Sequence, residues 1–471
     1  MDLRLSSSRF RTKDRIIAAV VMVLTALILC WAIILSGSQL GRGAADDWNY
    51  HWVAIQQFAQ QLPAPDLTDY ASATTPAYHL LLAGFAKAGL GHTGIQLIAS
   101  LWTLLLFGIL GWIASARFGK LAFVAVLPML ASIYVLHAGV WLLPDNAGWL
   151  GVLLILLLAL RSEQGWRTWA ISGLVLFVLV WFRQIHIWIA GVIWLSAWLG
   201  SQDQTPTLGS FFSGLFDRGG RAFIALACTV PAAGALFWFM GIWGGLVPPT
   251  FQEQHQGPNP ATPGFILTQL AIISVFFLPM LWPHLKEAWK HQWAWIILAA
   301  IIGCMLGVLP ASSYSYDDGR YSGWWRFVNQ APVVFDRSPI IMLGSVFGSI
   351  MLVVWLSLCT RRDAWIWIGA IVAFIVAQSA NHASWQRYHE PMLLMMVLLI
   401  LVRSPRAETF TRRVMLGSLA LSLAFGAITA MSMYYAAENE LQDQGQTTRH
   451  PQVRAESTIA FESRSGIIKI K

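Results

Sequence analysis

Charged residues are scarce in this chain. They make up 11% of its 471 residues, against about 25% in an average soluble domain. A chain so poor in charge is not an ordinary soluble globular protein. The formal net charge is +8, but the basic residues sit in short loops between apolar runs, where they set membrane topology and contact anionic lipid. We therefore expect membrane lipids as partners and no nucleic acid.

Cysteine is also rare. The four cysteines lie inside or at the end of apolar runs, with neither CxxC spacing nor histidine neighbours: Cys30, Cys228, Cys304 and Cys359. A disulfide framework or a structural zinc site needs paired or clustered cysteines at short, regular spacing. The sequence therefore predicts neither.

Hydrophobic residues, by contrast, make up 56% of the chain, and 25 residues are tryptophan. A helix crosses a hydrocarbon core about 30 Å thick with about 20 apolar residues, and such runs recur along nearly the whole sequence. We predict an all-α polytopic membrane protein with about 13 transmembrane helices within residues 1–436. The polar segment 437–471 has no evident motif, and we expect a partly disordered tail on the outer side.

The charges of the loops give the orientation. The first residues, MDLRLSSSRFRTKDR, are rich in Lys and Arg and are expected in the cytoplasm. The apolar run 16–35 has no convincing A-x-A cleavage site, so we interpret it as an uncleaved first helix. Further crossings are predicted at 95–115, 121–137, 147–160, twice within 168–200, and at 222–243, 265–282, 293–309, 340–359, 364–379, 391–402 and 414–434. The first outer loop, about 37–93, is polar and interrupted by proline, so we expect helices lying along the membrane surface there.

Some cations lie on the outer side against this topological bias. They are Arg42, Lys87, Arg183, Arg320, Arg326, Arg337 and Arg387, most of them in motifs that also hold Asp, Glu, His or Trp. A cation kept on the disfavoured side suggests an anionic ligand. Salt bridges to nearby carboxylates such as Asp317 or Glu390 explain it equally well, and the sequence does not decide between the two.

An acidic pair opens the first outer loop, in the stretch GRGAADDWNYHWVAIQQF. Asp46 and Asp47 follow a predicted membrane span directly and precede an aromatic, amphipathic run. Two adjacent carboxylates resist ionising together, and burial at a lipid boundary also raises a carboxyl pKa, so one of them is a candidate general base. The alternative is that they cap the helix beginning at Trp48 by accepting backbone N–H bonds.

The outer face as a whole gathers carboxylates, imidazoles and guanidinium groups, whereas the inner face offers mostly Lys and Arg. A transfer reaction with an anionic leaving group needs such a mixture, because a base must activate the attacking group and cations must hold the leaving phosphate. Aromatic side chains also suit the faces of sugars. Most of the tryptophans are nevertheless expected to serve as interfacial anchors.

Several short motifs, in one order along most of the chain, resemble a known family. They are DDWNYHW, SATTPAYHL, PDNAGW, WFRQIHIW, the GG followed by EQH, YDDGRYSGWW and SWQRYHEP. Together they resemble the GT-C membrane glycosyltransferases, and most closely the dolichyl-phosphate-glucose-dependent alpha-1,2-glucosyltransferase family of lipid-linked oligosaccharide assembly. The second acid is Asp47, where that branch has Glu.

The resemblance implies a GT-C-type fold with a cavity at the outer face. It implies an inverting transfer of a hexose, with glucose as the first candidate, from a polyprenyl-phosphate-sugar donor to a lipid-linked or cell-surface glycan acceptor. Asp47 would be the base, with Asp46 beside it. The donor phosphate would be bound by Arg183, Arg320, Arg387 and His389. The sugar and acceptor would contact His51, Asp145, Gln184, His186, His255, Asp318 and Trp324. No ligand spacing demands a metal, although a divalent ion beside the acidic pair is compatible with this chemistry.

Two other classes of protein share some of these features. A transporter or flippase for a lipid-linked sugar would also need charged groups, but it usually places them near the bilayer midplane on broken helices. A glycan ligase or polymerase would use a diphosphate-linked donor and a late outer loop rich in Arg and His. Short loops and the absence of an added soluble domain favour a bacterial plasma membrane over the endoplasmic reticulum, with the active site on the periplasmic or luminal side.

Overall fold

The computed structural model describes residues 12–38, 42–201, 215–255, 257–404 and 411–449. Within these ranges the chain forms helices and loops, and its only β-structure is two isolated bridges. The first part contains α1 (Thr12–Leu35), α2 (Arg42–Asp46), the π-helical turn η1 (Asp47–His51), α3 (Trp52–Gln61), α4 (Ala77–Lys87), α5 (His92–Phe118), η2 (Gly119–Leu121), α6 (Ala122–Ala131), α7 (Ile133–Val140), α8 (Asp145–Ala159), α9 (Trp166–Phe182), η3 (Gln184–Ile189) and α10 (Ala190–Leu199).

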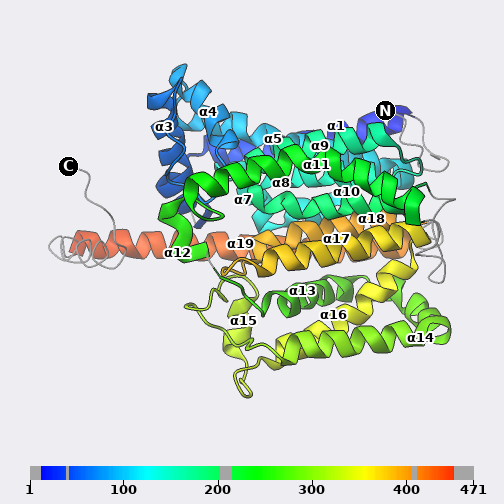
Figure 1. Cartoon of the computed structure of the whole chain (residues 1–471). Coiled ribbons are helices and arrows are strands. Elements are labelled where there is room, and N and C mark those ends of the chain that lie inside the picture. Colours follow the sequence, from blue (N-terminus) through cyan, green and yellow to red (C-terminus); the bar gives the residue numbers. More distant parts are fainter. Residues whose placement is uncertain (1–11, 39–41, 202–214, 256, 405–410, 450–471) are drawn as a thin grey trace.

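The second part contains α11 (Leu215–Trp243), η5 (Pro249–Phe251), α12 (Gln252–His255), α13 (Thr262–Phe276), α14 (Leu278–Val308), α15 (Trp325–Gln330), α16 (Pro339–Ser357), α17 (Arg361–Ser379), η6 (Gln386–Tyr388), α18 (Glu390–Arg403) and α19 (Thr411–Arg449). The long helices lie roughly side by side, and the short helices α3, α4, α12 and α15 gather at one end of the bundle, on the left of Figure 1.

Seven of the described helices are long and apolar enough to cross a membrane, or up to eight if the bent pair α7 and α8 is one span. The helices α9, η3 with α10, and α13 are also apolar but shorter. The chain is therefore a multi-pass membrane protein whose regular structure, in the residues described, is helical. The apolar runs that the sequence predicted to cross are helical over most of their length, with breaks at Ser132 and Phe277, but the full number of about 13 crossings stays a prediction.

Two expected boundaries can be compared with the helices. The first outer loop contains α2, α3 and α4, whereas their position along a membrane surface stays a prediction. The last helix, α19, continues to Arg449, so the first part of the segment predicted as a disordered tail is helical. The remainder of that segment lies outside the described residues.

Small residues let some helices approach closely. A Cβ atom added to Gly303 of α14 would lie 2.6 Å from the carbonyl oxygen of Ser345 on α16, and one added to Gly348 would lie 1.9 Å from the carbonyl oxygen of Leu267 on α13. Membrane helices have no strong hydrophobic force between them and associate through such close backbone packing. The helices α13, α14 and α16 thereby form one packed layer (Figure 1).

A bend in the chain positions the site. Helices α7 and α8 meet at an angle of 114° across a short break. The break contains Pro144, which fits the first helical turn because it needs no amide hydrogen there. Asp145 is the first residue of α8, so the bend places its carboxylate at the end of the bundle that holds α2 and η6.

Candidate functional site

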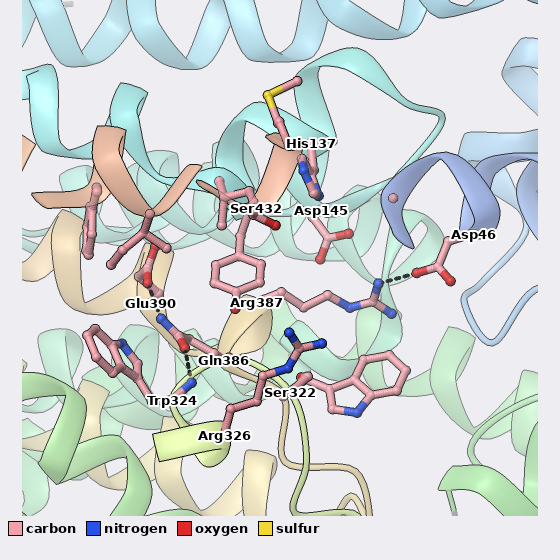
Figure 2. A pocket seen from close by; sticks show the side chains of 18 of the residues that line it. Asp46, His137, Asp145, Ser322, Trp324, Arg326, Gln386, Arg387, Glu390 and Ser432 are labelled. Atoms are coloured by element: carbon pink, nitrogen blue, oxygen red, sulfur yellow. Dashed lines mark hydrogen bonds and ion pairs between the residues drawn. The ribbon is translucent and has the colours of Figure 1, made fainter. Parts of the chain in front are cut away.

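A cavity of about 760 Å³ opens at this end of the bundle. Its wall comes from five segments that are far apart in the sequence. They are α2, the α7–α8 bend, the loop that leads into α15, η6 with the start of α18, and the part of α19 between Phe425 and Tyr435. The lining residues with polar side chains include Asp46, Tyr134, His137, Asp145, Ser322, Trp324, Arg326, Gln330, Gln386, Arg387, Glu390 and Ser432. Figure 2 shows most of these side chains directed into the same space.

Asp46 and Arg387 form an ion pair at the cavity wall. Nη1 of Arg387 donates to Oδ2 of Asp46 at 2.6 Å, and both side chains are mostly buried. The guanidinium also lies 4.1 Å from the ring centroid of Trp385 and donates to the hydroxyl of Tyr388. Burial opposes the charge of Arg387, but Tyr388, Asp46 and Asp145 raise its pKa above the usual value. The cation therefore persists at physiological pH and fixes one oxygen of Asp46.

A second ion pair stands beside the first. Arg183 lies in the break between α9 and η3 and pairs through Nη1 with Oδ1 of Asp145. Its guanidinium is 5.0 Å from the ring centroid of Tyr388, and that of Arg387 is 5.1 Å from the same ring. Asp145 lines the cavity, whereas Arg183 is buried behind it. Each carboxylate thus has its own guanidinium.

Asp47 is placed differently from the expectation. It is fully buried and does not line the cavity. Its carboxylate is within hydrogen-bonding distance of Nε2 of His92 at 2.9 Å, and accepts from Nε2 of Gln96 at 3.0 Å and from the backbone N–H of Leu142 at 3.3 Å. Because successive residues of a helical segment point about 100° apart, the two adjacent acids face opposite environments. The cavity receives Asp46, and Asp47 supports the α7–α8 bend.

The capping alternative does not describe this pair. Helical structure continues from α2 through η1 into α3, so no helix begins at Trp48. No side-chain cap hydrogen bond is present at the start of η1 or of α3. Trp48 instead stacks on His92 with ring centroids 4.1 Å apart, which holds the imidazole against Asp47.

Several histidines expected at the site lie outside the cavity lining. His51 contacts His79, with Nδ1 and Nε2 2.9 Å apart. Nδ1 of His255 lies 3.4 Å from Oδ1 of Asn381. Burial lowers the pKa of His255 to about 4; the hydrogen bond to Asn381 opposes this shift, and the charges of Arg387 and Arg183 add to it. His186 is buried against Gly148 and Trp149, and neither of its ring nitrogens has a partner among the described residues.

The remaining expected residues divide in the same way. Trp324 lines the cavity. His389 is fully buried beside Gln269. Gln184 donates to the carbonyls of Ala73 and Leu246 and accepts from the backbone N–H of Thr75. It therefore connects the loop before α4 with the loop after α11. Arg320 pairs with Asp318 at 2.9 Å and donates to the carbonyl of Ser313, outside the cavity lining. These contacts hold the end of the bundle together.

Arg326 was not among the expected site residues. It projects from α15 into the cavity (Figure 2), is exposed, and forms no ion pair with any residue in the described part of the chain. Its place on the disfavoured side of the membrane was a usable signal in the sequence. Glu390 gave the same kind of signal, because it is an acid at the edge of a predicted span.

Tyr134, His137 and Gln386 also line the cavity and were missed. Tyr134 and His137 belong to an apolar run that was predicted to cross the membrane, and only the break at Ser132 and the bend after Val140 bring them to the cavity. Gln386 links two walls: it donates to Glu390 at 2.5 Å and accepts from the backbone N–H of Trp324 at 2.8 Å.

Metal binding was left open by the sequence. Among the residues that the structure describes, no group of three or more His, Cys, Asp or Glu side chains is placed to hold a metal ion.

Fold and site together define a multi-pass membrane protein with a charged, aromatic-lined cavity at one end of its helices. No protein-family model and no curated protein matches the sequence. Among solved structures, the chain is similar to ArnT from Cupriavidus metallidurans, in a crystal structure bound to undecaprenyl phosphate. The identity is 17%, the match covers 89% of this chain and 77% of that chain, and the TM-score is 0.41. At these values the likeness assigns neither a fold family nor an activity to this chain.

Proposed function

We propose that this protein is a GT-C-type inverting glycosyltransferase that moves a hexose from a polyprenyl-phosphate donor to a lipid-linked or cell-surface glycan. The observation that supports it best is the cavity wall itself. It carries a carboxylate fixed by one guanidinium, Asp46 with Arg387, and also the guanidinium of Arg326, which has no acidic partner in the described part of the chain. A base and a free cation in one cavity suit an attack with an anionic leaving group. The ordered sequence motifs add glucose as the first candidate sugar.

Asp46 is the proposed base. Arg387 holds Oδ2, so the other carboxylate oxygen is available to take the proton of the acceptor hydroxyl. The hydroxyl oxygen then bonds to the anomeric carbon while the bond from that carbon to the phosphate oxygen breaks. The polyprenyl phosphate leaves with the electron pair. This assignment exchanges the roles expected for Asp46 and Asp47, because the buried Asp47 already has partners from three directions.

Arg326 is the proposed partner of the departing phosphate. Of the cations expected to bind it, Arg183, Arg320 and Arg387 already pair with carboxylates, and His389 is fully buried. A guanidinium without a carboxylate partner can donate to phosphate oxygens at two points. Arg183 and Arg387 then act by holding Asp145 and Asp46 in place.

The other walls of the cavity fit a lipid-linked sugar. Phe425, Ile428 and Met433 of α19 form an apolar side, which suits an isoprenoid chain. Trp324 and Trp385 give flat aromatic surfaces beside the charged groups, which suit the apolar face of a hexose. In the topology that the loop charges predict, the cavity lies on the periplasmic side of a bacterial plasma membrane.

A transporter is less well supported by the site. Its charges are expected near the bilayer midplane, whereas here the ion pairs Asp46–Arg387 and Asp145–Arg183 lie at the cavity, at the end of the bundle that holds the short helices α3, α12 and α15 (Figure 1). A ligase or polymerase with a diphosphate-linked donor would need more free cations than the cavity shows. Of the two arginines among the described residues that line it, Arg387 pairs with Asp46 and only Arg326 has no acidic partner.

The proposal is tested by profiling lipid-extracted glycans from cells with and without the gene. We expect the deletion strain to lack one terminal hexose, and a plasmid copy to restore it. Identical glycan profiles in the two strains, with the protein present in the parent membrane, would overturn the proposal.

A further inference from the structure

An apolar turn projects from the loop between α15 and α16. It consists of Pro332, Val333, Val334 and Phe335, which we call the apolar tip. Val333 and Val334 are each 49% exposed, and Phe335 is 89% exposed. A cluster of this kind is unusual on a surface that faces water and marks an interaction site.

Several polar groups of the turn are hydrogen-bonded within the loop. Val334 and Arg337 exchange backbone hydrogen bonds of 2.9 Å in both directions. The carbonyl of Asp336 accepts from Ser312 and Ser313, and its carboxylate accepts from the hydroxyl of Ser313. Backbone groups paired in this way enter a medium without water at a lower cost than unpaired ones. The side of the turn that faces outward is apolar.

The tip is fixed to the end of a candidate membrane span. The guanidinium of Arg337 donates to the carbonyls of Val308 and Leu309, at the end of α14, and to the carbonyl of Phe335. Phe335 also comes just before Pro339, the first residue of the span α16. The tip is therefore held at the depth where two membrane-length helices end.

The tip continues an apolar surface. Next to it, Leu309 is 67% exposed at the end of α14, and Leu343 is 72% exposed on the first turns of α16. Exposed leucines on a membrane-length helix face lipid. Phe335 has a φ of 49°, a conformation that bulky residues rarely adopt, and the bonds of Arg337 hold it there with the ring outward.

We propose that the apolar tip inserts into the lipid leaflet on the cavity side of the membrane. Lipid is the occupant because the tip borders the exposed leucines at the ends of α14 and α16, and because the Arg337 guanidinium is directed back onto the carbonyls of Val308 and Leu309. The tip follows α15 directly, so insertion would hold Arg326 near the depth of lipid phosphates. The use of Arg326 to bind a phosphate rests on the proposed function, whereas the insertion of the tip does not.

Spin labelling in lipid nanodiscs tests the insertion. The native cysteines are replaced by alanine, and the label is attached to Phe335→Cys or Val333→Cys. The matched control is Tyr316→Cys, an exposed aromatic position in the loop before α15 that lies next to Asp317 and Asp318. Oxygen concentrates in lipid, whereas a nickel chelate stays in water, so their collision rates with the label report its depth. Monodisperse nanodiscs show that each variant is folded.

We expect oxygen collisions to exceed nickel collisions at positions 333 and 335, and the reverse order at position 316. Nickel collisions that dominate at 333 and 335 as they do at 316 would place the tip in water and overturn the proposal. The measurement needs no sugar donor, so loss of the proposed function would leave this outcome unchanged. Conversely, a tip in water would leave the transferase proposal standing.

Discussion

The guanidinium of Arg326 has no acidic partner among the described residues that line the cavity. If it binds the donor phosphate, Arg326→Gln should raise KM for the donor about tenfold to a hundredfold, because a charge-assisted hydrogen bond contributes about 1.5–3 kcal/mol. Arg326→Lys should recover only part of this loss, since an ammonium lacks the planar two-point geometry. Steady-state kinetics across donor concentrations measure both effects.

Lys87→Ala is the matched control for Arg326. Lys87 is a cation in the first outer loop that donates to the carbonyl of Leu62, away from the cavity. Its loss should leave KM unchanged. Equal KM values for Arg326→Gln and the parent would remove Arg326 from the phosphate site.

Asp47 should matter for stability more than for chemistry. Asp47→Asn leaves at least one of the buried groups at His92, Gln96 and the Leu142 amide with a poorer partner. An unsatisfied buried polar group costs about 1–3 kcal/mol, so the melting temperature in detergent should fall. Activity per folded molecule should fall much less than in Asp46→Asn. An unchanged melting temperature with lost turnover would return Asp47 to the role of base.

The sequence predicted that an acidic pair opens the site, but it could not assign the two acids. Both residues precede the same aromatic run, and their difference arises from the helical turn that joins α2 to η1. Only the folded chain shows that Asp46 meets Arg387, a partner 341 positions further on. The same holds for Tyr134, whose apolar neighbours gave no sign of a cavity.

At the scale of elements, a chain of hydrogen bonds holds the loop before α15 against α18. Ser132 donates to Glu390, Gln386 donates to Glu390, and the amide of Trp324 donates to Gln386. Gly323 has a φ of 53°, and a Cβ atom there would lie 2.3 Å from Oε1 of Gln386, so the loop sits directly on this amide. Gln386 is therefore a positioning residue for Trp324 and Arg326.

An exchange of the two side chains tests this role. Gln386→Glu places two carboxylates in contact and should raise KM for the donor about tenfold. Glu390→Gln keeps a donor and an acceptor and should be tolerated. The double variant restores all three hydrogen bonds. The carboxylate introduced at position 386 can accept from the backbone of Trp324 and from the side-chain amide introduced at position 390, whose oxygen can still accept from Ser132. We expect the double variant to recover the parent KM for the donor. A KM as high as that of Gln386→Glu would contradict the positioning role of Gln386.

The pair His51 and His79 predicts how the first outer loop responds to pH. Burial lowers the pKa of His51 to about 3, with Arg387 and Arg183 adding to the shift, and burial likewise lowers the pKa of His79 well below its usual value. The unfolded chain binds protons below its ordinary pKa of about 6.5, whereas the folded pair stays neutral. Stability from this pair is therefore complete above about pH 6.5 and declines as the pH falls toward 3.

Hydrogen exchange of α3 and α4 at pH 7.5 and pH 5 measures this effect. We expect faster exchange at the lower pH after correction for the intrinsic rates. In His51→Gln combined with His79→Gln, the difference between the two pH values should shrink. An identical difference in parent and double variant would assign the pH response to other groups.

The helices themselves were largely predictable, because a run of about 20 apolar residues has few other solutions in a membrane. Breaks inside the runs were not. Ser132 separates α6 from α7 inside the predicted run 121–137, and the loop predicted after that run did not indicate the 114° bend between α7 and α8. Such breaks depend on tertiary partners, here the carboxylate of Asp47 on the Leu142 amide and that of Glu390 on Ser132.

At the scale of the whole molecule, the helices bring five separate segments to one end of the bundle (Figure 1) and leave a cavity between them. The charge pattern of the loops predicted that these segments share a side of the membrane. The sequence left open whether the outer cations bind an anionic ligand or pair with carboxylates, and in the structure Arg183 and Arg320 pair with Asp145 and Asp318. Pairing depends on side-chain geometry that loop charge alone does not encode.

The most direct test of the account is transfer by the purified protein in proteoliposomes. The assay supplies undecaprenyl-phosphate glucose with a radiolabelled sugar, and membrane lipid extract from the deletion strain as the source of acceptor. We expect the parent to move the label to a glycan-bearing product, and Asp46→Asn to lower turnover per folded molecule about 10²- to 10⁴-fold. Asp66→Asn, in the same loop but exposed, should match the parent. Parent-like turnover by Asp46→Asn, or no transfer by the parent, would contradict the account.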